Sequence, residues 1–143
     1  MRSGRTRLAW ALRTPCNALT GADFVPGCEI GPGAHITHPS GLVLAAKARV
    51  GSHATFAGGV VVAGVRNYDI EDPEAGSVGE TVVGDHVFFG ANSVVLVGVA
   101  IGDHAVIGAN SVVRHDVEAR SIVSGIPAKH VAYRTPGRAS SRS

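Results

Sequence analysis

The chain has 143 residues, of which 45% are hydrophobic and only 5% aromatic, and it contains 19 glycines. This length fits one domain, and the composition predicts a narrow core of valine, isoleucine and alanine with glycine at tight corners. The net charge of +2 comes mostly from arginines near the two ends, so the middle of the chain has no basic patch that would indicate nucleic-acid binding.

Cysteine content and hydropathy indicate the cellular compartment in which the protein is expected. Cys16 and Cys28 are too few for a disulfide framework and lack the spacing of a metal site, which favours a reducing environment. The apolar run from Leu8 to Leu12 is about half the length that a signal peptide needs. No segment approaches the roughly 20 apolar residues of a membrane span. We therefore expect a cytoplasmic protein without a membrane partner.

Residues 1–22 do not follow the pattern of the rest of the chain. Leu8, Trp10, Leu12 and Leu19 stand among arginines and threonines, which predicts a short helix or arm interrupted by Pro15. The ends of a repeat protein expose unpaired strand edges, so we expect this arm to cap the first coil.

From Phe24 onward, apolar residues recur every six positions, at Phe24, Ile30 and Ile36. A period of six fits neither an ordinary helix nor a hairpin. Short fixed periods of this kind are typical of a β-helix, in which each unit is one strand and one turn. The chain is therefore expected to wind as an all-β solenoid.

The six-residue phase then slips, because Leu44 follows Ile36 by eight positions before the period resumes at Val50, Phe56 and Val62. Two extra residues must bulge from the coil in the segment 36–41, which contains His38. Bulges re-aim side chains and tend to lie beside active sites.

The phase is lost again in the polar, acidic segment 64–80, which predicts a long loop, and we favour a flap on the substrate side. The repeat is then cleanest from Val83 to Val113 and is expected to continue to about Ser124. Its fifth position is occupied by small or β-branched residues: Val87, Ser93, Val99, Ala105, Ser111 and Val117. We expect an arm at 1–22, a repeat domain at 23–132 and a disordered tail at 133–143.

Three histidines, His53, His86 and His104, occupy the fourth position of their repeats, at a solvated corner. Nothing in their spacing makes them converge with a further ligand, so surface turn residues are favoured over a metal site. No metal is therefore expected.

The stretch DFVPGCEIGPGAHITHPSGLVLAAKARVGSHATFAGGVVVAG and the ending GIPAKHV resemble serine O-acetyltransferases and related enzymes that acetylate polysaccharide sugars. The resemblance covers roughly residues 22–132. It implies a left-handed parallel β-helix, a homotrimer, and acetyl-CoA bound in the groove between subunits.

The resemblance also implies roles for single residues. His38 matches the general base, and Asp23 matches the carboxylate that orients it. An imidazole is suited to removing a hydroxyl proton at neutral pH, and a carboxylate on one ring nitrogen fixes the tautomer. Gly58 and Gly59 would let backbone N–H groups approach an oxyanion. The positions that would contact CoA are Ala63, Gly64, Ala91 and Ala109, with Lys129 and Arg134 for its phosphates; plain coil packing is the alternative for the alanines.

Two features depart from the serine-specific enzymes. The long helical domain that precedes their repeats is not seen, and their Arg-His pair before the coil of Val83 corresponds to Gly79 and Glu80. Glu80 would repel an amino-acid carboxylate, as would other acidic residues of the loop such as Asp69. This favours a neutral hydroxyl or one near a cationic amine, as on a sugar or an amino-sugar-bearing metabolite. A solvated acidic loop that touches no substrate is the alternative.

We therefore expect an acetyl-CoA-dependent O-acetyltransferase that acts on a hydroxyl of a small molecule or sugar. Two alternatives remain open. One is serine acetylation with a different carboxylate anchor, such as Arg66. The other is a catalytically silent β-helix subunit that serves as a scaffold.

Overall fold

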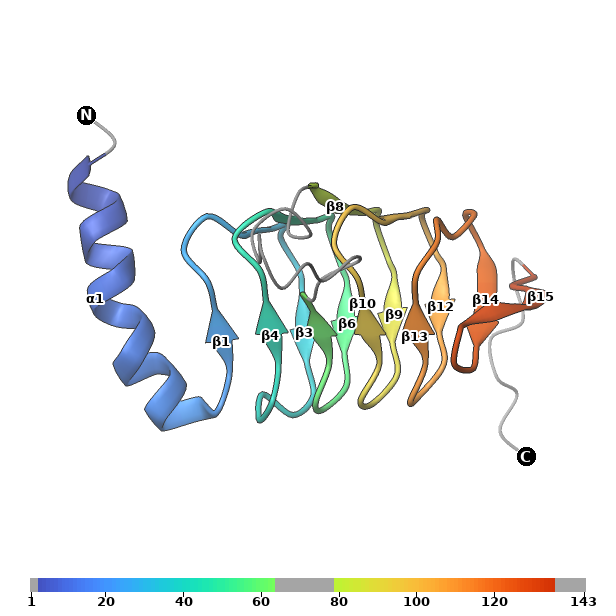
Figure 1. The fold of residues 1–143 in the computed structure, drawn as a ribbon, viewed down its shortest axis with the longest axis horizontal. Helices are drawn as coiled ribbons and strands as arrows, with labels where there is room; N and C mark the ends of the chain where they lie inside the picture. The colour runs from blue at the N-terminus through green and yellow to red at the C-terminus, as the bar shows by residue number, and fades with distance from the viewer. Residues whose placement is uncertain (1–2, 64–78, 136–143) are drawn as a thin grey trace, which may run out of the picture.

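The computed structural model describes residues 3–63 and 79–135. Gly64, Arg66 and Asp69, most of the expected loop and the residues after 135 lie outside this described part. A single long helix, α1 (Ser3–Thr20), is followed by a solenoid of short strands (Figure 1). No helix in the described part is long and apolar enough to cross a membrane.

The strands form three sheets, one on each face of the solenoid. Face 1 contains β1 (Asp23–Phe24), β4 (Val43–Leu44), β7 (Val61–Val62), β10 (Val94–Val95) and β13 (Val112–Val113). Face 2 contains β2 (Glu29–Ile30), β5 (Ala48–Val50), β8 (Thr81–Val83) and β11 (Ala100–Ile101). Face 3 contains β3 (His35–Ile36), β6 (Thr55–Phe56), β9 (Phe88–Phe89), β12 (Val106–Ile107), β14 (Ser121–Ser124) and β15 (Lys129–Tyr133).

Successive strands visit the three faces in turn and pair in parallel with the strand one coil away. Val61 pairs with Val43, and Val106 pairs with Phe88, so one full coil takes 18 residues, or three repeats of six. The all-β solenoid that the hexapeptide period predicted is confirmed.

The core is the narrow aliphatic column that the composition predicted. The second residue of most strands points inward and is buried, as at Leu44, Val62 and Val95. Two aromatic rings, Phe56 and Phe89, stack with their centroids 4.9 Å apart inside face 3. Ser93 and Ser111 are also buried in this column. The interior is narrow and closely packed, so these positions have little room for larger side chains.

The predicted slip in register is also confirmed. Val43 pairs with Asp23 and Thr55 with His35, which places partners 20 residues apart where regular coils have 18. The two extra residues lie in the turn between β3 and β4, which carries His38.

The expected continuation of the repeat to Ser124 is wrong in one respect. Val117 forms a bridge with Ile101, and Ile122 pairs with Val106, so partners here are only 16 residues apart. Val117 therefore occupies the inward position of Ile101 and not the fifth position of Val99. The shortened turn is stabilised by Asp116, whose carboxylate accepts a hydrogen bond of 2.9 Å from the amide of Ala100.

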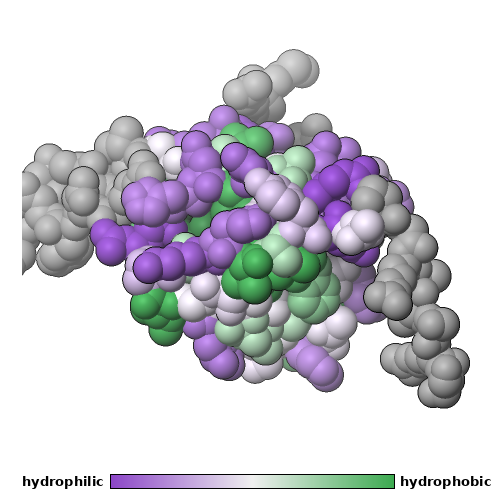
Figure 2. All heavy atoms as spheres, turned by 90° about the vertical axis from the view of Figure 1, so that its right-hand side faces the viewer, coloured by the Kyte–Doolittle hydropathy of each residue, from purple (hydrophilic) through white to green (hydrophobic). Residues whose placement is uncertain are grey.

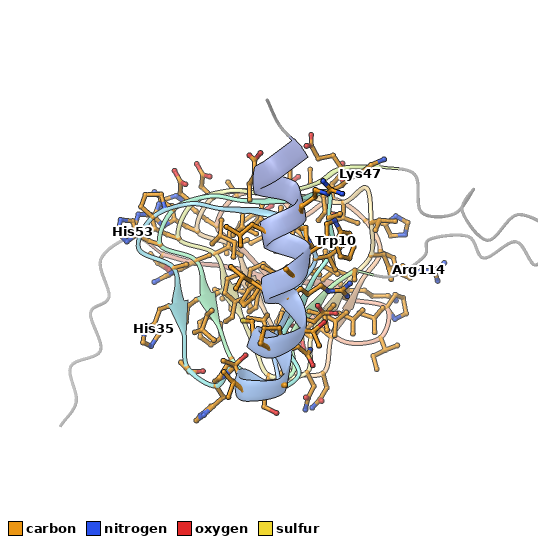
Figure 3. The ribbon with its side chains drawn as sticks, turned by 90° about the vertical axis from the view of Figure 1, so that its left-hand side faces the viewer. Trp10, His35, Lys47, His53 and Arg114 are labelled. Atoms are coloured by element: carbon orange, nitrogen blue, oxygen red, sulfur yellow. The ribbon has the colours of Figure 1, made fainter. Side chains whose placement is uncertain are left out.

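The helix α1 lies across the first coil, and Figure 3 shows it crossing that end of the solenoid. Contrary to the sequence-based expectation, Pro15 does not interrupt it. Proline removes one hydrogen bond of the helix, and the contacts of α1 with the first coil oppose a break. Leu8, Leu12 and Leu19 remain exposed on its surface.

At the other end, β15 pairs antiparallel with β14. Tyr133 belongs to this strand, so the ordered chain continues past the predicted boundary at residue 132. Ile126, Val131 and Tyr133 are exposed here, and Figure 2 shows apolar and polar surface side by side on this end.

Candidate functional site

The turns that lead from face 3 to face 1 form one corner of the solenoid, which we call the small-residue corner. His38, Gly58, Ala91 and Ala109 lie on it, each two residues after its strand on face 3. Because the paired strands are in register, these four positions follow one another along the corner. The fold thus brings together the predicted base, the predicted oxyanion position Gly58 and two of the positions predicted to contact CoA.

His38 is exposed at the start of this row. Its turn is held by Thr37, whose amide and hydroxyl both donate to the carbonyl of Phe56, at 3.0 and 3.1 Å. A side chain at Gly58 would place its Cβ 3.3 Å from the Cβ of His38, so glycine leaves room for the imidazole. Within the described part of the chain, the imidazole of His38 has no hydrogen-bond partner.

Some backbone N–H groups on the small-residue corner have no acceptor within the described part of the chain. Gly59, Asn92 and Asn110 donate their amide hydrogens to carbonyls of the preceding coil, at 3.1, 2.9 and 2.8 Å. In residues 3–63 and 79–135, the amides of Gly58, Ala91 and Ala109 have no such acceptor. Adjacent strands are about 4.8 Å apart, so these amides form a row of available donors. Such donors can bind the carbonyl groups of an extended ligand or stabilise an oxyanion.

Asp23, the predicted orienting carboxylate, is held by Arg13 of α1. The guanidinium donates to both carboxylate oxygens at 2.6 Å. These hydrogen bonds lower the pKa of Asp23, against an opposing effect of burial. In this structure Asp23 is therefore paired with Arg13 and not with His38, and its role as orienter stays a prediction.

Sequence reasoning missed Arg13 and Trp10. The Arg13 guanidinium lies 5.3 Å from the centroid of the Trp10 ring, within cation–π range. The available signal was the spacing of Trp10, Arg13 and Asn17, which places the three on one helical face.

The remaining residues predicted to contact CoA lie in different parts of the fold. Lys129 pairs with Ser124, whose side chain lies beside Gly108 on the small-residue corner. Arg134 instead lines a cavity with His53, His86 and His104. Ala63 follows β7, at the far edge of face 1. The fold thus brings Lys129 to the row and separates Arg134 and Ala63 from it.

Glu80, predicted to repel an amino-acid acceptor, is paired on face 2. Its carboxylate accepts a hydrogen bond of 2.5 Å from Arg49, which also forms an ion pair with Glu29. Both carboxylates act to raise the pKa of Arg49. Glu80 is therefore partly neutralised within its own chain.

The turns from face 2 to face 3 form a second corner, the histidine corner, which carries His53, His86 and His104. Their imidazoles stack in a column with centroids 4.9 Å apart. All three have left-handed backbone, with φ of 54°, 55° and 58°. Among the residues that the structure describes, no group of three or more His, Cys, Asp or Glu is arranged to hold a metal ion.

Parts of the chain match the sequences of known proteins. Residues 80–114 match the family model described as the hexapeptide repeat of succinyl-transferase. A 60-residue stretch is 62% identical to the 2,3,4,5-tetrahydropyridine-2,6-dicarboxylate N-acetyltransferase of Lacticaseibacillus casei (strain BL23), covering 42% of this chain and 24% of that protein.

Solved structures of serine acetyltransferases resemble most of the chain. A serine acetyltransferase from Neisseria gonorrhoeae is 33% identical with a TM-score of 0.81, over 94% of this chain and 49% of that one. A serine acetyltransferase in complex with CoA is 27% identical with a TM-score of 0.77, over 89% and 49%. The chain thus spans about half the length of its structural relatives. The resemblance to hexapeptide-repeat acyltransferases is confirmed.

Proposed function

We propose that this chain, which resembles the hexapeptide-repeat acyltransferases, moves an acetyl group from acetyl-CoA to a hydroxyl of a small molecule or sugar. One observation carries the proposal: an exposed histidine, His38, stands at the end of a row of unused backbone amides on the small-residue corner. A general base beside oxyanion donors is the arrangement that acyl transfer to a hydroxyl requires.

Acetyl-CoA would supply the thioester whose acyl group becomes the ester of the acceptor. His38 would take the proton of the attacking hydroxyl at an imidazole nitrogen and return it to the departing thiolate. The amide of Gly58, next to His38, is the candidate donor to the negatively charged oxygen. Ala91 and Ala109 would donate to the amide carbonyls of the pantetheine arm, and Lys129 would bind a phosphate at the far end.

The assembly belongs to the same proposal. A left-handed winding and a homotrimer are supported by the likeness to serine acetyltransferases. Exposed apolar residues on the flat faces, Val82 on face 2 and Phe88 on face 3, also favour contacts between copies. In such a trimer, a neighbouring subunit would form the second wall of the groove along the small-residue corner.

Serine is a second candidate acceptor, because solved structures of serine acetyltransferases resemble most of the chain. Glu80 argues less strongly against it, since Arg49, which also pairs with Glu29, partly neutralises its charge. The candidate carboxylate anchor Arg66 lies outside the described residues, so the choice between serine and a sugar depends on the assay.

The test is release of the CoA thiol from acetyl-CoA in the presence of sugars, amino sugars, nucleotide sugars, serine and homoserine. We expect acceptor-dependent release and a product ester that hydroxylamine cleaves. A product stable to hydroxylamine would indicate transfer to nitrogen and overturn the O-acetyl assignment. If no acceptor supports release and CoA does not raise the melting temperature, the chain is a scaffold subunit.

A further inference from the structure

A cavity of about 460 Å³ lies between α1 and the start of the first coil. Its walls are Trp10, Arg13, Thr14 and Asn17 from the helix and Asp23 from β1. Figure 3 shows Trp10 on the opposite side of α1 from His35 and His53. The cavity is therefore separate from the histidine corner.

The cavity combines one aromatic face with several polar groups. Trp10 is 50% exposed, so part of its indole is open to solvent. Arg13 connects this ring to Asp23, through a cation–π contact on one side and two hydrogen bonds on the other. Within the described part of the chain, the side chains of Thr14 and Asn17 have no hydrogen-bond partner and can serve a ligand.

The backbone connects this cavity to the turn that carries His38. The amide of Gly41 donates to the carbonyl of Gly21, immediately after α1, at 2.9 Å. A Cβ on Gly21 would lie 3.1 Å from the Cα of Ser40. The end of α1 thus packs directly on the His38 turn, and Asp23 follows two residues later.

We infer that this cavity binds a sugar ring of the acceptor, an inference that rests on the proposed acetyl transfer. The exposed indole offers a flat apolar surface to the C–H face of a pyranose. Asn17, Thr14 and the outer lone pairs of Asp23 offer both donors and acceptors to its hydroxyl groups.

The charges in the cavity favour a sugar over a free amino acid. Arg13 is already engaged by both oxygens of Asp23, so a carboxylate ligand would have to displace that ion pair. A neutral sugar needs no such displacement, and it uses the indole face, for which serine has no matching apolar surface. The cavity therefore favours a glycan or amino-sugar acceptor over a free amino acid.

Trp10 is the only tryptophan in the chain, so its fluorescence reports on this cavity without any turnover. The full chain is titrated with glucose, galactose, glucosamine and N-acetylglucosamine, and with L-serine for comparison. We expect a saturable change in emission with at least one sugar and none with serine. Asn17→Ala should weaken that sugar at least about fivefold, whereas Leu19→Ala, on the exposed surface of the same helix, should not.

Kinetics separate this inference from the proposed function. Trp10→Ala should raise the acceptor KM about tenfold, equivalent to the loss of one good contact, and leave the KM of acetyl-CoA unchanged; Trp10→Phe should retain part of the affinity. Saturable sugar binding without acetyl transfer would uphold the sugar site and refute the transfer. Transfer to a sugar with an unchanged acceptor KM in Trp10→Ala, or no sugar response in fluorescence, would overturn the sugar site.

Discussion

Two of the three corners of the solenoid, the small-residue corner and the histidine corner, have similar backbones but different surfaces. Both use left-handed residues to turn the chain, with φ of 71° at Gly59 on the small-residue corner and 54° at His53 on the histidine corner. On the histidine corner, stacked imidazoles cover the turns. On the small-residue corner, Gly58 and Ala91 leave the backbone open. The equivalent turn amides of the histidine corner, those of Ser52 and Asp85, already donate to the carboxylates of Asp85 and Asp103, at 2.6 and 2.8 Å. These internal acceptors, which the small-residue corner lacks among the described residues, decide which corner can present its amides to a ligand.

Removing the imidazole at each corner should separate them most strongly. His38→Ala should lower kcat/KM by about 10² to 10⁴-fold, the usual effect of losing a general base. His86→Ala should leave kcat/KM close to that of the unchanged protein, because His86 faces away from the row of amides. Thiol release at saturating acetyl-CoA measures both. Equal losses in the two variants would mean that the two corners do not differ in function.

Glycine substitutions should separate stability from activity within the small-residue corner. Gly59 has φ of 71°, so Gly59→Ala forces an L-residue into left-handed backbone, at a cost of about 1–2 kcal/mol. Gly58 lacks positive φ but lies under His38, so Gly58→Ala should mainly reduce activity. Urea unfolding and thiol release distinguish them. The reverse pattern would show that Gly58, and not Gly59, maintains the turn.

The Arg13–Asp23 pair should make a smaller, pH-dependent contribution to stability. Because Arg13 lowers the pKa of Asp23 in the folded state below the usual 3.8, the contribution is complete above that value and is lost as the pH falls through the lowered pKa. Arg13→Met should therefore lower the melting temperature at pH 7, and the difference should shrink below about pH 4. A difference that does not change with pH would refute an ionic contribution.

The stacked imidazoles of the histidine corner should contribute least to the stability of the fold. Aromatic pairs are worth about 0.5–1.5 kcal/mol, so His53→Ala, which breaks one contact of the column, should reduce the free energy of unfolding by about that amount. His115→Ala, an exposed histidine outside the column, is the matched control. If the two variants unfold at the same urea concentration, the column has no structural role.

The repeat was predictable from the sequence because inward positions must be apolar and must recur once per strand. The bulge at His38 followed from the same count. The shortened last coil was missed because Val117 is apolar and fits either a fifth position or an inward one. Only pairing with Ile101 distinguishes the two.

The sequence predicts the site residues that lie at equivalent positions of the repeat. It does not predict contacts between separate elements, such as the helix and the first coil. His38, Gly58, Ala91 and Ala109 each lie two residues after an inward apolar residue, which the repeat phase gives. Because the phase slips at 36–41 and is lost in 64–80, only the strand pairing aligns the four in one row. Arg13 meets Asp23 only because α1 lies across the first coil, which no periodicity encodes. Arg134 joins the histidine corner because β15 reverses direction, so its closeness in sequence to Lys129 was misleading.

The central claim is that the small-residue corner, and not the histidine corner, binds CoA. Isothermal titration with CoA of the unchanged protein, Ala91→Leu and His86→Ala tests it directly, with thermal unfolding as the check that each variant is folded. A leucine at position 91 would cover the free amide, so we predict binding at least about tenfold weaker in Ala91→Leu and unchanged in His86→Ala. Unchanged binding in Ala91→Leu, or loss of binding in His86→Ala, would contradict the claim.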